Sequence, residues 1–265
     1  MSKQSKPVFL LPHLGLGDQI LVNGMLRYLL KKHDHVVMPV KKNNLKALQR
    51  MFKGTEDLYL LPIDGTLSYS DNQHVEDAKQ FAKFYQSIGY EFVGLGAFGN
   101  FPQQFSEITD GKRMTYEKFF YKEAGIPFEE KWDSFAYSRE HDKEMALFNT
   151  HYKHLNLKEG KYIFLHHDPE RGRTIDAKYI RTDLPIVSPI TKFYDGDLFD
   201  YGYILENAAE IHMTNSAFAD FSDFLDLSKV SKKVIHMYAM APGHTFCPVT
   251  YKNDFKVIYS NLELV

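Results

Sequence analysis

The sequence of 265 residues is poor in cysteine, because Cys247 is its single thiol. One cysteine excludes an intramolecular disulfide framework and a cysteine-ligated zinc site, and it fits a reducing compartment. Long apolar runs are missing too. The first one, Val8–Leu11, is far too short for a signal sequence or a membrane span, and no other stretch approaches membrane length. We therefore expect a soluble, cytoplasmic protein without a membrane span.

An excess of positive charge is also lacking. The 32 Lys and Arg residues against 34 Asp and Glu leave a net charge of -2, which gives no bulk signal for nucleic-acid binding. The turn after the first strand does not follow the G-x-G-x-x-G fingerprint, and the sequence contains no P-loop lysine and no G-x-S-x-G elbow. These absences argue against a dinucleotide enzyme, a P-loop kinase and a serine hydrolase.

What the chain does have is an ordinary globular composition, 44% hydrophobic and 25% charged, with alternating strand and helix patterns. In the first part of the chain, the expected strands are residues 8–11, 35–40, 57–61 and 92–95, and the expected helices are residues 19–32, 45–52 and 75–88. Such alternation predicts a parallel sheet with right-handed crossovers.

The alternation stops between residues 101 and 140, an aromatic and charged stretch that we interpret as a helix and loops, and then it restarts. The expected helices of the second part are residues 140–155, 201–209 and 217–227, and the expected strands are residues 162–166, 186–187, 210–213 and 233–237. The prediction is an α/β protein with two Rossmann-like lobes, residues 1–138 and 139–265, facing a central cleft.

The first candidate site is the turn after the first strand, which reads His13-Leu14-Gly15-Leu16-Gly17-Asp18. Gly15 and Gly17 allow a sharp turn and a close approach of the backbone to a ligand. Asp18 would repel a phosphate, so it suits a general base or a group that binds sugar hydroxyls, with helix capping as an equal alternative. His13 could have either a structural or a functional role.

A second candidate site follows the strand at residues 162–166. Arg171 and Arg173 flank a glycine and offer forked hydrogen-bond donors to a diphosphate, with a solvated charged loop as the alternative. The adjacent side chains of His166, His167 and Asp168 point to opposite sides of an extended chain, which argues against a shared metal ion.

The third candidate is Thr214-Asn215-Ser216, which opens the expected helix at residues 217–227. Hydroxyl and free N–H groups at a helix start can hold phosphate, although plain helix capping also explains these residues. Upstream, Glu206 could accept hydrogen bonds from ribose hydroxyls or simply face solvent. The Asp195-Gly196-Asp197 sequence is interpreted as a turn rather than a metal site.

Together these motifs resemble glycosyltransferases of the two-lobed GT-B architecture. The turn that ends in Asp18 is similar to the opening of the bacterial heptosyltransferase-like families, where an Asp in this turn is the general base. The Thr214-Asn215-Ser216 turn and the loop from His167 to Arg173 resemble donor-binding segments of these enzymes and of fucosyltransferases. Short proteins of giant viruses and bacterial polysaccharide loci with an H-x-G-L-G-D start are also similar.

The resemblance implies an inverting, metal-independent glycosyltransferase with no cofactor besides its substrates, a nucleotide-diphosphate sugar donor and a glycan acceptor. Asp18 would be the base and His13 would orient the acceptor in lobe 1–138. The expected contacts of the donor are the following residues: Gly15, Gly17, His167, Arg171, Arg173, Glu206, Thr214, Asn215 and Ser216. The alternatives are a non-catalytic module that binds a nucleotide or nucleotide sugar, and a sugar epimerase or kinase.

Overall fold

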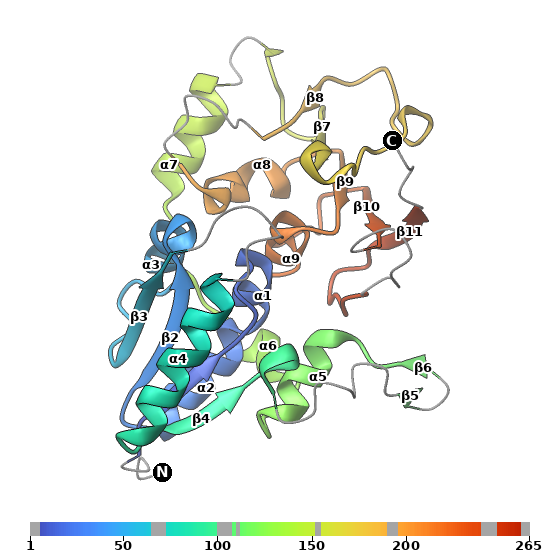
Figure 1. The fold of residues 1–265 in the computed structure, drawn as a ribbon. Helices are drawn as coiled ribbons and strands as arrows, with labels where there is room; N and C mark the ends of the chain where they lie inside the picture. The colour runs from blue at the N-terminus through green and yellow to red at the C-terminus, as the bar shows by residue number, and fades with distance from the viewer. Residues whose placement is uncertain are drawn as a thin grey trace. The chain divides into compact units, whose positions relative to one another are not determined.

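The computed structural model describes residues 6–64, 73–99, 108–109, 112–151, 155–189, 196–239 and 248–260. The chain divides into two compact units, Met1–Ser138 and Arg139–Val265. Each unit is built on its own parallel sheet, and Figure 1 labels their helices and strands.

The first unit contains a four-stranded parallel sheet of order β3-β2-β1-β4. Its strands are β1 (Val8–Leu11), β2 (Val36–Lys41), β3 (Leu58–Ile63) and β4 (Glu91–Gly94). The helices that connect them are α1 (Leu16–Leu21), α2 (Asn23–Lys32), α3 (Leu45–Met51) and α4 (Gln73–Ser87), with the 3-10 turns η1 (Lys42–Asn44) and η2 (Gly96–Phe98). The predicted parallel sheet of the first lobe is confirmed.

Apolar side chains from the sheet and from α4 form one core of this unit. Its buried members are Phe9, Leu11, Leu14, Val37, Ile63, Ala78 and Ala82. The small alanines of α4 let the helix lie close to β1, and Figure 1 shows α4 alongside this sheet. Because β1 is buried on both faces, its side chains are apolar without alternation, as the sequence indicates.

The single helix predicted at residues 19–32 is wrong in one respect, because the chain forms α1 and α2 with a break at Val22. The Tyr121 hydroxyl lies in this break. It accepts a hydrogen bond from the Met25 amide (3.0 Å) and donates one to the Leu21 carbonyl (3.1 Å). A side chain inserted between these two backbone groups interrupts the helical ladder, and hydrophobic periodicity carries no sign of it.

The rest of the first unit consists of the hairpin β5 (Ile108–Thr109) and β6 (Lys112–Arg113), and the helices α5 (Tyr116–Glu123) and α6 (Glu130–Asp133). Helix α6 packs closely on α2. A Cβ atom at Gly24 would lie 1.9 Å from the Glu130 carbonyl oxygen, so this approach requires glycine. The sequence analysis predicted a helix and loops for residues 101–140 and missed the short hairpin of β5 and β6.

The second unit contains a five-stranded parallel sheet of order β11-β10-β9-β7-β8. Its strands are β7 (Ile163–His166), β8 (Ile186–Val187), β9 (Glu210–Thr214), β10 (Lys232–Tyr238) and β11 (Lys256–Ser260). Strand β11 was not predicted. It lies at the edge of the sheet and is only partly buried, and its apolar run of three residues is shorter than the run of four in β1.

Short helices precede and connect these strands. They are α7 (His141–Ala146), the π turn η4 (Leu147–His151), the 3-10 turns η6 (Pro169–Arg171), η7 (Ala177–Tyr179) and η8 (Leu198–Tyr201), and the helices α8 (Gly202–Glu206) and α9 (Ala217–Ser222). The predicted helix at 217–227 therefore ends early, at Ser222. No helix in the described parts of the chain is long and apolar enough to cross a membrane.

Candidate functional site

The β1–α1 turn carries the first candidate group. Helix α1 begins after Gly15, and Asp18 lies in its first turn, where a carboxylate interacts favourably with the helix dipole. A Cβ atom at Gly15 would lie 2.5 Å from Asp18 Oδ2, so the Asp18 carboxylate occupies the place of a side chain at that position. Glycine at position 15 is thus explained by the folded-back carboxylate. Gly17 follows within the same helical turn.

His13 and Asp18 face each other across this turn, with 4.0 Å between Nδ1 and Oδ1. That separation is too long for a hydrogen bond, and both side chains remain partly accessible to solvent, 30% for His13 and 24% for Asp18. The His13 ring packs on the edges of Phe120 and Phe98, at centroid distances of 4.9 and 5.9 Å. An imidazole and a carboxylate are therefore held together on an apolar base with access to solvent, an arrangement that can receive a proton.

In the second unit, the loop after β7 is closed on itself. Backbone hydrogen bonds of 2.9 Å join Asp168 and Arg173 in both directions, and Gly172 makes the turn with a left-handed φ of 67°. His167 Nδ1 accepts a hydrogen bond of 3.0 Å from the Ile175 amide, and burial lowers the pKa of His167. The loop that the sequence singles out is thus an ordered element.

The two predicted arginines of this loop differ in their surroundings. Arg173 is 2% exposed and donates from its guanidinium to the carbonyls of Asn215 (3.2 Å) and Ala239 (3.4 Å). Arg171 keeps its guanidinium at the surface, 3.4 Å from the Asp168 carboxylate. Arg173 therefore joins the ends of β7, β9 and β10, whereas Arg171 is accessible to a charged ligand.

Asn215 also contributes to the packing of strand ends. Its side-chain amide donates to the Tyr238 carbonyl (3.1 Å) and accepts from the Tyr238 amide (2.9 Å), which extends the pairing of β9 and β10 beyond their last residues. Its predicted contact with the donor is untested, and the structure shows the scaffold role. The same holds for Arg173.

Glu206 lies at the end of α8 in an ion pair. Arg139 donates to both of its carboxylate oxygens, at 2.8 and 2.5 Å, and also binds the buried carboxylate of Glu144. Glu144 in turn accepts a hydrogen bond of 2.7 Å from the Tyr203 amide in the first turn of α8. The Glu206 carboxylate is therefore engaged within the protein, and its predicted contact with a ribose stays a prediction.

His166, Thr214 and Ser216 come together where β7 and β9 end. His166 Nδ1 lies 3.2 Å from the Ser216 hydroxyl and 3.4 Å from the Thr214 hydroxyl. Burial lowers the pKa of the His166 imidazole to about 4, so this side chain is neutral near pH 7. Nothing in the sequence indicated that the motifs at residues 166–173 and 214–216 are neighbours. The structure places His166 of the first motif beside Thr214 and Ser216 of the second.

A pocket of about 460 Å³ adjoins this cluster, a volume within the usual range for small-molecule sites. We call it the His166 pocket. Its lining includes Leu165, His166, Pro189, Asp197, Tyr201 and Phe218. The Phe218 ring lies 4.7 Å from the His166 ring, and Tyr201 packs on Phe218 at 5.3 Å. Sequence reasoning missed both aromatic residues, since α9 and the η8–α8 segment present them only in the fold.

Of the predicted Asp195-Gly196-Asp197 turn, Asp195 lies outside the described residues, as does Cys247. Asp197 caps η8 by accepting a hydrogen bond of 2.9 Å from the Phe199 amide, and the Asp200 carboxylate accepts one of 3.1 Å from the Asp197 amide. This reciprocal capping agrees with the interpretation as a turn. Among the described residues, no group of three or more His, Cys, Asp or Glu side chains could hold a metal ion.

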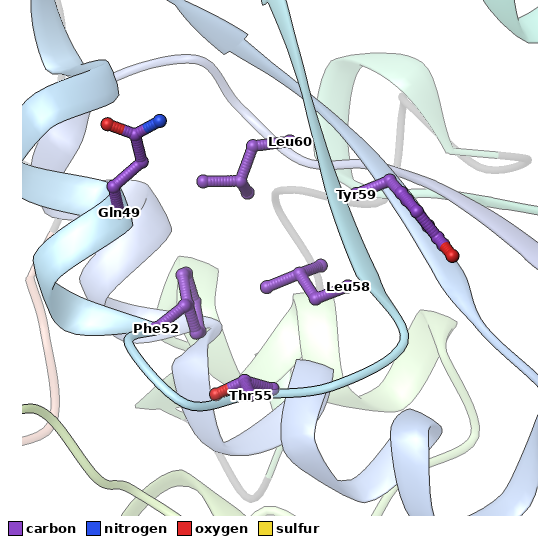
Figure 2. Close-up of a pocket in the computed structure, with 6 residues that line it drawn as sticks. All are labelled: Gln49, Phe52, Thr55, Leu58, Tyr59 and Leu60. Atoms are coloured by element: carbon purple, nitrogen blue, oxygen red, sulfur yellow. The ribbon is translucent and has the colours of Figure 1, made fainter.

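A smaller pocket of about 300 Å³ lies in the first unit, between α3 and strand β3. Figure 2 shows Leu58 and Leu60 pointing toward Phe52, and Tyr59 pointing to the other side of the strand. Gln49 and Thr55 complete its lining. With neither carboxylate nor imidazole among these residues, the pocket offers no group for proton transfer, and the β1–α1 turn stays the candidate site of this unit.

No protein-family model and no curated protein sequence matches this chain. Among solved structures, the glycosyl transferase family 9 protein of Veillonella parvula is similar in fold, with a TM-score of 0.53 and 12% identity over 98% of this chain and 87% of that one. UGT89C1 of Arabidopsis thaliana, complexed with quercetin, gives a TM-score of 0.43 at 9% identity over 89% of this chain and 80% of its own. The heptosyltransferase WaaC of E. coli, with ADP, gives a TM-score of 0.44 at 8% identity, over 96% of this chain and 91% of its own.

At such low identity, the similarity to the family 9 structure establishes a shared fold. The predicted α/β fold class with two Rossmann-like lobes is confirmed by this similarity and by the two parallel sheets. The resemblance to GT-B glycosyltransferases is thus confirmed at the level of fold. The narrower resemblance to heptosyltransferases, fucosyltransferases or viral proteins stays a prediction.

Proposed function

We propose that this protein is a glycosyltransferase that moves a sugar from a nucleotide-diphosphate donor to a hydroxyl of a glycan acceptor. The observation that carries the proposal is the partly exposed pair of His13 and Asp18 at the carboxyl end of β1, within a fold shared with a glycosyl transferase of family 9. Ligands of open parallel sheets bind at the carboxyl ends of the strands, and both units present their polar turns there.

In the proposed reaction, the acceptor binds to the first unit. Asp18 accepts the proton of the acceptor hydroxyl while the oxygen attacks C1 of the donor sugar. The bond between C1 and the diphosphate oxygen breaks, and its electron pair leaves with the nucleoside diphosphate. A single displacement of this kind inverts the configuration at C1. His13, 4.0 Å from Asp18, orients the acceptor.

The donor binds to the second unit in this proposal. Arg171 is an accessible cation of the loop after β7, and the hydroxyls of Thr214 and Ser216 are neutral donors beside His166 at the carboxyl ends of β7 and β9. Forked donors and fixed hydroxyls stabilise the negative charge of the leaving diphosphate without a metal ion. The His166 pocket next to these hydroxyls has the volume and the aromatic lining for the nucleoside.

A non-catalytic module that binds a nucleotide or nucleotide sugar is the second candidate. Arg171 and the hydroxyls of Thr214 and Ser216 would serve it in the same way, because binding of the donor needs no general base. Such a module would bind the donor but would not transfer its sugar to any acceptor. It would also not hydrolyse the donor when no acceptor is present.

The test is thermal unfolding of the purified protein with UDP, GDP, ADP, TDP and CMP, each with and without EDTA. A ligand that binds only the folded state at a hundredfold excess over Kd adds about 2.7 kcal/mol of stability, which is readily detected as a rise in Tm. We expect a rise with one diphosphate that EDTA leaves unchanged. No rise with any nucleotide would contradict both candidate functions, and a rise that EDTA abolishes would contradict metal independence.

A further inference from the structure

Helices α1 and α2 are joined through a single residue whose backbone leaves the helical conformation. Val22 has φ −94° and ψ 6°, whereas a helical residue has ψ of about −42°. The Tyr121 hydroxyl accepts from the Met25 amide at 3.0 Å and donates to the Leu21 carbonyl at 3.1 Å. In a continuous helix these two backbone groups are bonded to each other, because each amide donates to the carbonyl four residues earlier. One phenol group therefore lies between the two helices.

The break is tied directly to the backbone of Asp18. The Val22 amide donates to the Asp18 carbonyl at 3.1 Å, so a change of direction at Val22 moves Asp18 as well. The buried side chain of Gln19 donates to the Pro39 carbonyl of β2 at 3.3 Å. Because α1 has only six residues, its direction depends on Gln19 and Tyr121 more than on its own hydrogen bonds.

Helix α5 also supports the other member of the candidate pair. Phe120 precedes Tyr121 in α5, and its ring lies 4.9 Å from the His13 ring. Both aromatic side chains of α5 are buried. Adjacent positions of one helix thus contact His13 directly and Asp18 through the break, so α5 fixes the imidazole and the carboxylate relative to each other.

We propose that Tyr121 is a positioning residue, which holds α1 in the direction that places the Asp18 carboxylate beside His13. Without the hydroxyl, the Met25 amide and the Leu21 carbonyl are buried without a partner, and a direct bond between them satisfies both. That bond continues α2 into α1 and displaces Asp18. The inference rests on the proposed function, in which Asp18 is the general base.

The first test is structural and needs no activity. Tyr121→Phe removes only the hydroxyl, and Tyr162→Phe is the matched control, because the buried Tyr162 hydroxyl donates to a backbone carbonyl of the second unit at 2.8 Å. Long-range HNCO spectra detect hydrogen bonds from backbone amides to carbonyls. In Tyr121→Phe alone, we expect a new correlation between the Met25 amide and the Leu21 carbonyl and a shift of the His13 ring signals. Unmoved His13 signals would overturn the proposal.

The second test is a double-mutant cycle of Tyr121→Phe with Asp18→Asn. Release of UDP, GDP or ADP from UDP-glucose, GDP-mannose or ADP-glucose, with water as the acceptor, measures kcat for the donor whose diphosphate raises Tm. Tyr121→Phe alone should lower kcat by about tenfold to a hundredfold, because a misplacement of about 1 Å has an effect of this size. In the Asp18→Asn background it should change kcat by less than about twofold, and the diphosphate affinity should stay within about twofold throughout.

The outcomes separate a positioning role from a structural one. Loss of Tm with unchanged kcat, or an equal fall of kcat in both backgrounds, would show that Tyr121 only stabilises the fold, and would overturn the proposal. An equal fall in Tyr162→Phe would do the same. If wild type turns over none of these donors, the proposed function is refuted, and the spectra alone decide whether Tyr121 holds α1 in place.

A Tyr121→4-aminophenylalanine variant covers the case in which Tyr121→Phe does not fold. Its amino group donates to the Leu21 carbonyl but accepts poorly from the Met25 amide, because its lone pair is conjugated with the ring. We expect this variant to fold and to lower kcat about threefold where Asp18 is present, the effect of one weakened hydrogen bond. An unchanged kcat, or the same fall in the Asp18→Asn background, would overturn the proposal.

Discussion

The two parallel sheets differ in what they bury. In the first unit, strand β1 and most of β2 are apolar and buried, and the polar groups of interest lie beyond the strand end, partly exposed in the turn that holds His13 and Asp18. In the second unit, polar residues run through the buried strands themselves. Glu210, His212 and His236 are all buried in β9 and β10.

The same difference appears in how the turns are held. His13 Nδ1 lies 4.0 Å from Asp18 Oδ1, both side chains are partly exposed, and the His13 ring rests on the Phe120 ring. In the second unit, the side chains of Arg173 and Asn215 are hydrogen-bonded to backbone groups of neighbouring strand ends. Partly exposed acid and base groups suit proton transfer and fixed groups suit binding of a ligand, which supports the proposed division of roles between the two units.

The sharpest test of this comparison is Asp18→Asn. Loss of a general base should lower the transfer rate by about 10²–10⁴-fold, because proton transfer contributes that much to catalysis. The affinity for the nucleoside diphosphate should stay within twofold, since donor binding is assigned to the other unit. Steady-state kinetics and calorimetry measure the two quantities, and Asp34→Asn at an exposed position is the control. Weaker donor binding with undiminished turnover at saturation would assign Asp18 to the donor.

A smaller effect should separate the two arginines of the loop after β7. Arg173→Ala removes a buried guanidinium and leaves two strand-end carbonyls without their donor, so the free energy of unfolding should fall by about 2–3 kcal/mol. Arg171→Ala at the surface should change it by less than about 0.5 kcal/mol and weaken diphosphate binding instead.

Urea denaturation and calorimetric titration of both variants check this division. Equal loss of stability in the two would show that Arg171 also supports the loop. A stable Arg173→Ala protein with lost diphosphate affinity would return Arg173 to the role expected from the sequence.

Much of the fold followed from the sequence, because buried parallel strands have continuous apolar runs that are visible without a structure. Strands β1 and β7 are examples, and the segments that follow them hold candidate residues. The break at Val22 was missed because its cause is the hydroxyl of Tyr121, about a hundred positions along the chain. Local patterns carry no information on such a contact.

The candidate site was predicted in residue type more than in role. Arg171 and Arg173 are equivalent in the sequence, and only packing distinguishes the exposed guanidinium from the buried one. Glu206 was expected to face a ribose or solvent, while Arg139 occupies its carboxylate. Partners distant in the sequence decide these roles, so a motif alone cannot.

The buried histidines of the second sheet make a last comparison with the first. His212 Nδ1 lies 3.2 Å from His236 Nε2, and His212 Nε2 lies 3.3 Å from the Glu210 carboxylate. A carboxylate can only accept, so the proton of His212 is on Nε2, and Nε2–H of His236 donates to Nδ1 of His212. This leaves His236 Nδ1 as a buried acceptor with no partner among the described residues.

Burial lowers the pKa of His236 to about 4 and also lowers that of His212, with Lys232 and His167 adding to the effect on His236. A histidine with a lowered pKa is neutral in the folded protein and takes up protons more readily when unfolded. Its stabilisation is therefore complete above pH 6.5 and is lost as the pH falls from 6.5 to about 4. The expected loss from His236 is about 2 kcal/mol between pH 7.5 and pH 5.

Urea denaturation at pH 7.5 and pH 5 measures this loss, and His236→Phe should reduce it, because the phenyl ring cannot take up a proton. Protonation of the unfolded chain at the remaining histidines is common to both proteins and cancels in the comparison. An unchanged dependence in His236→Phe would show that the acid sensitivity arises elsewhere.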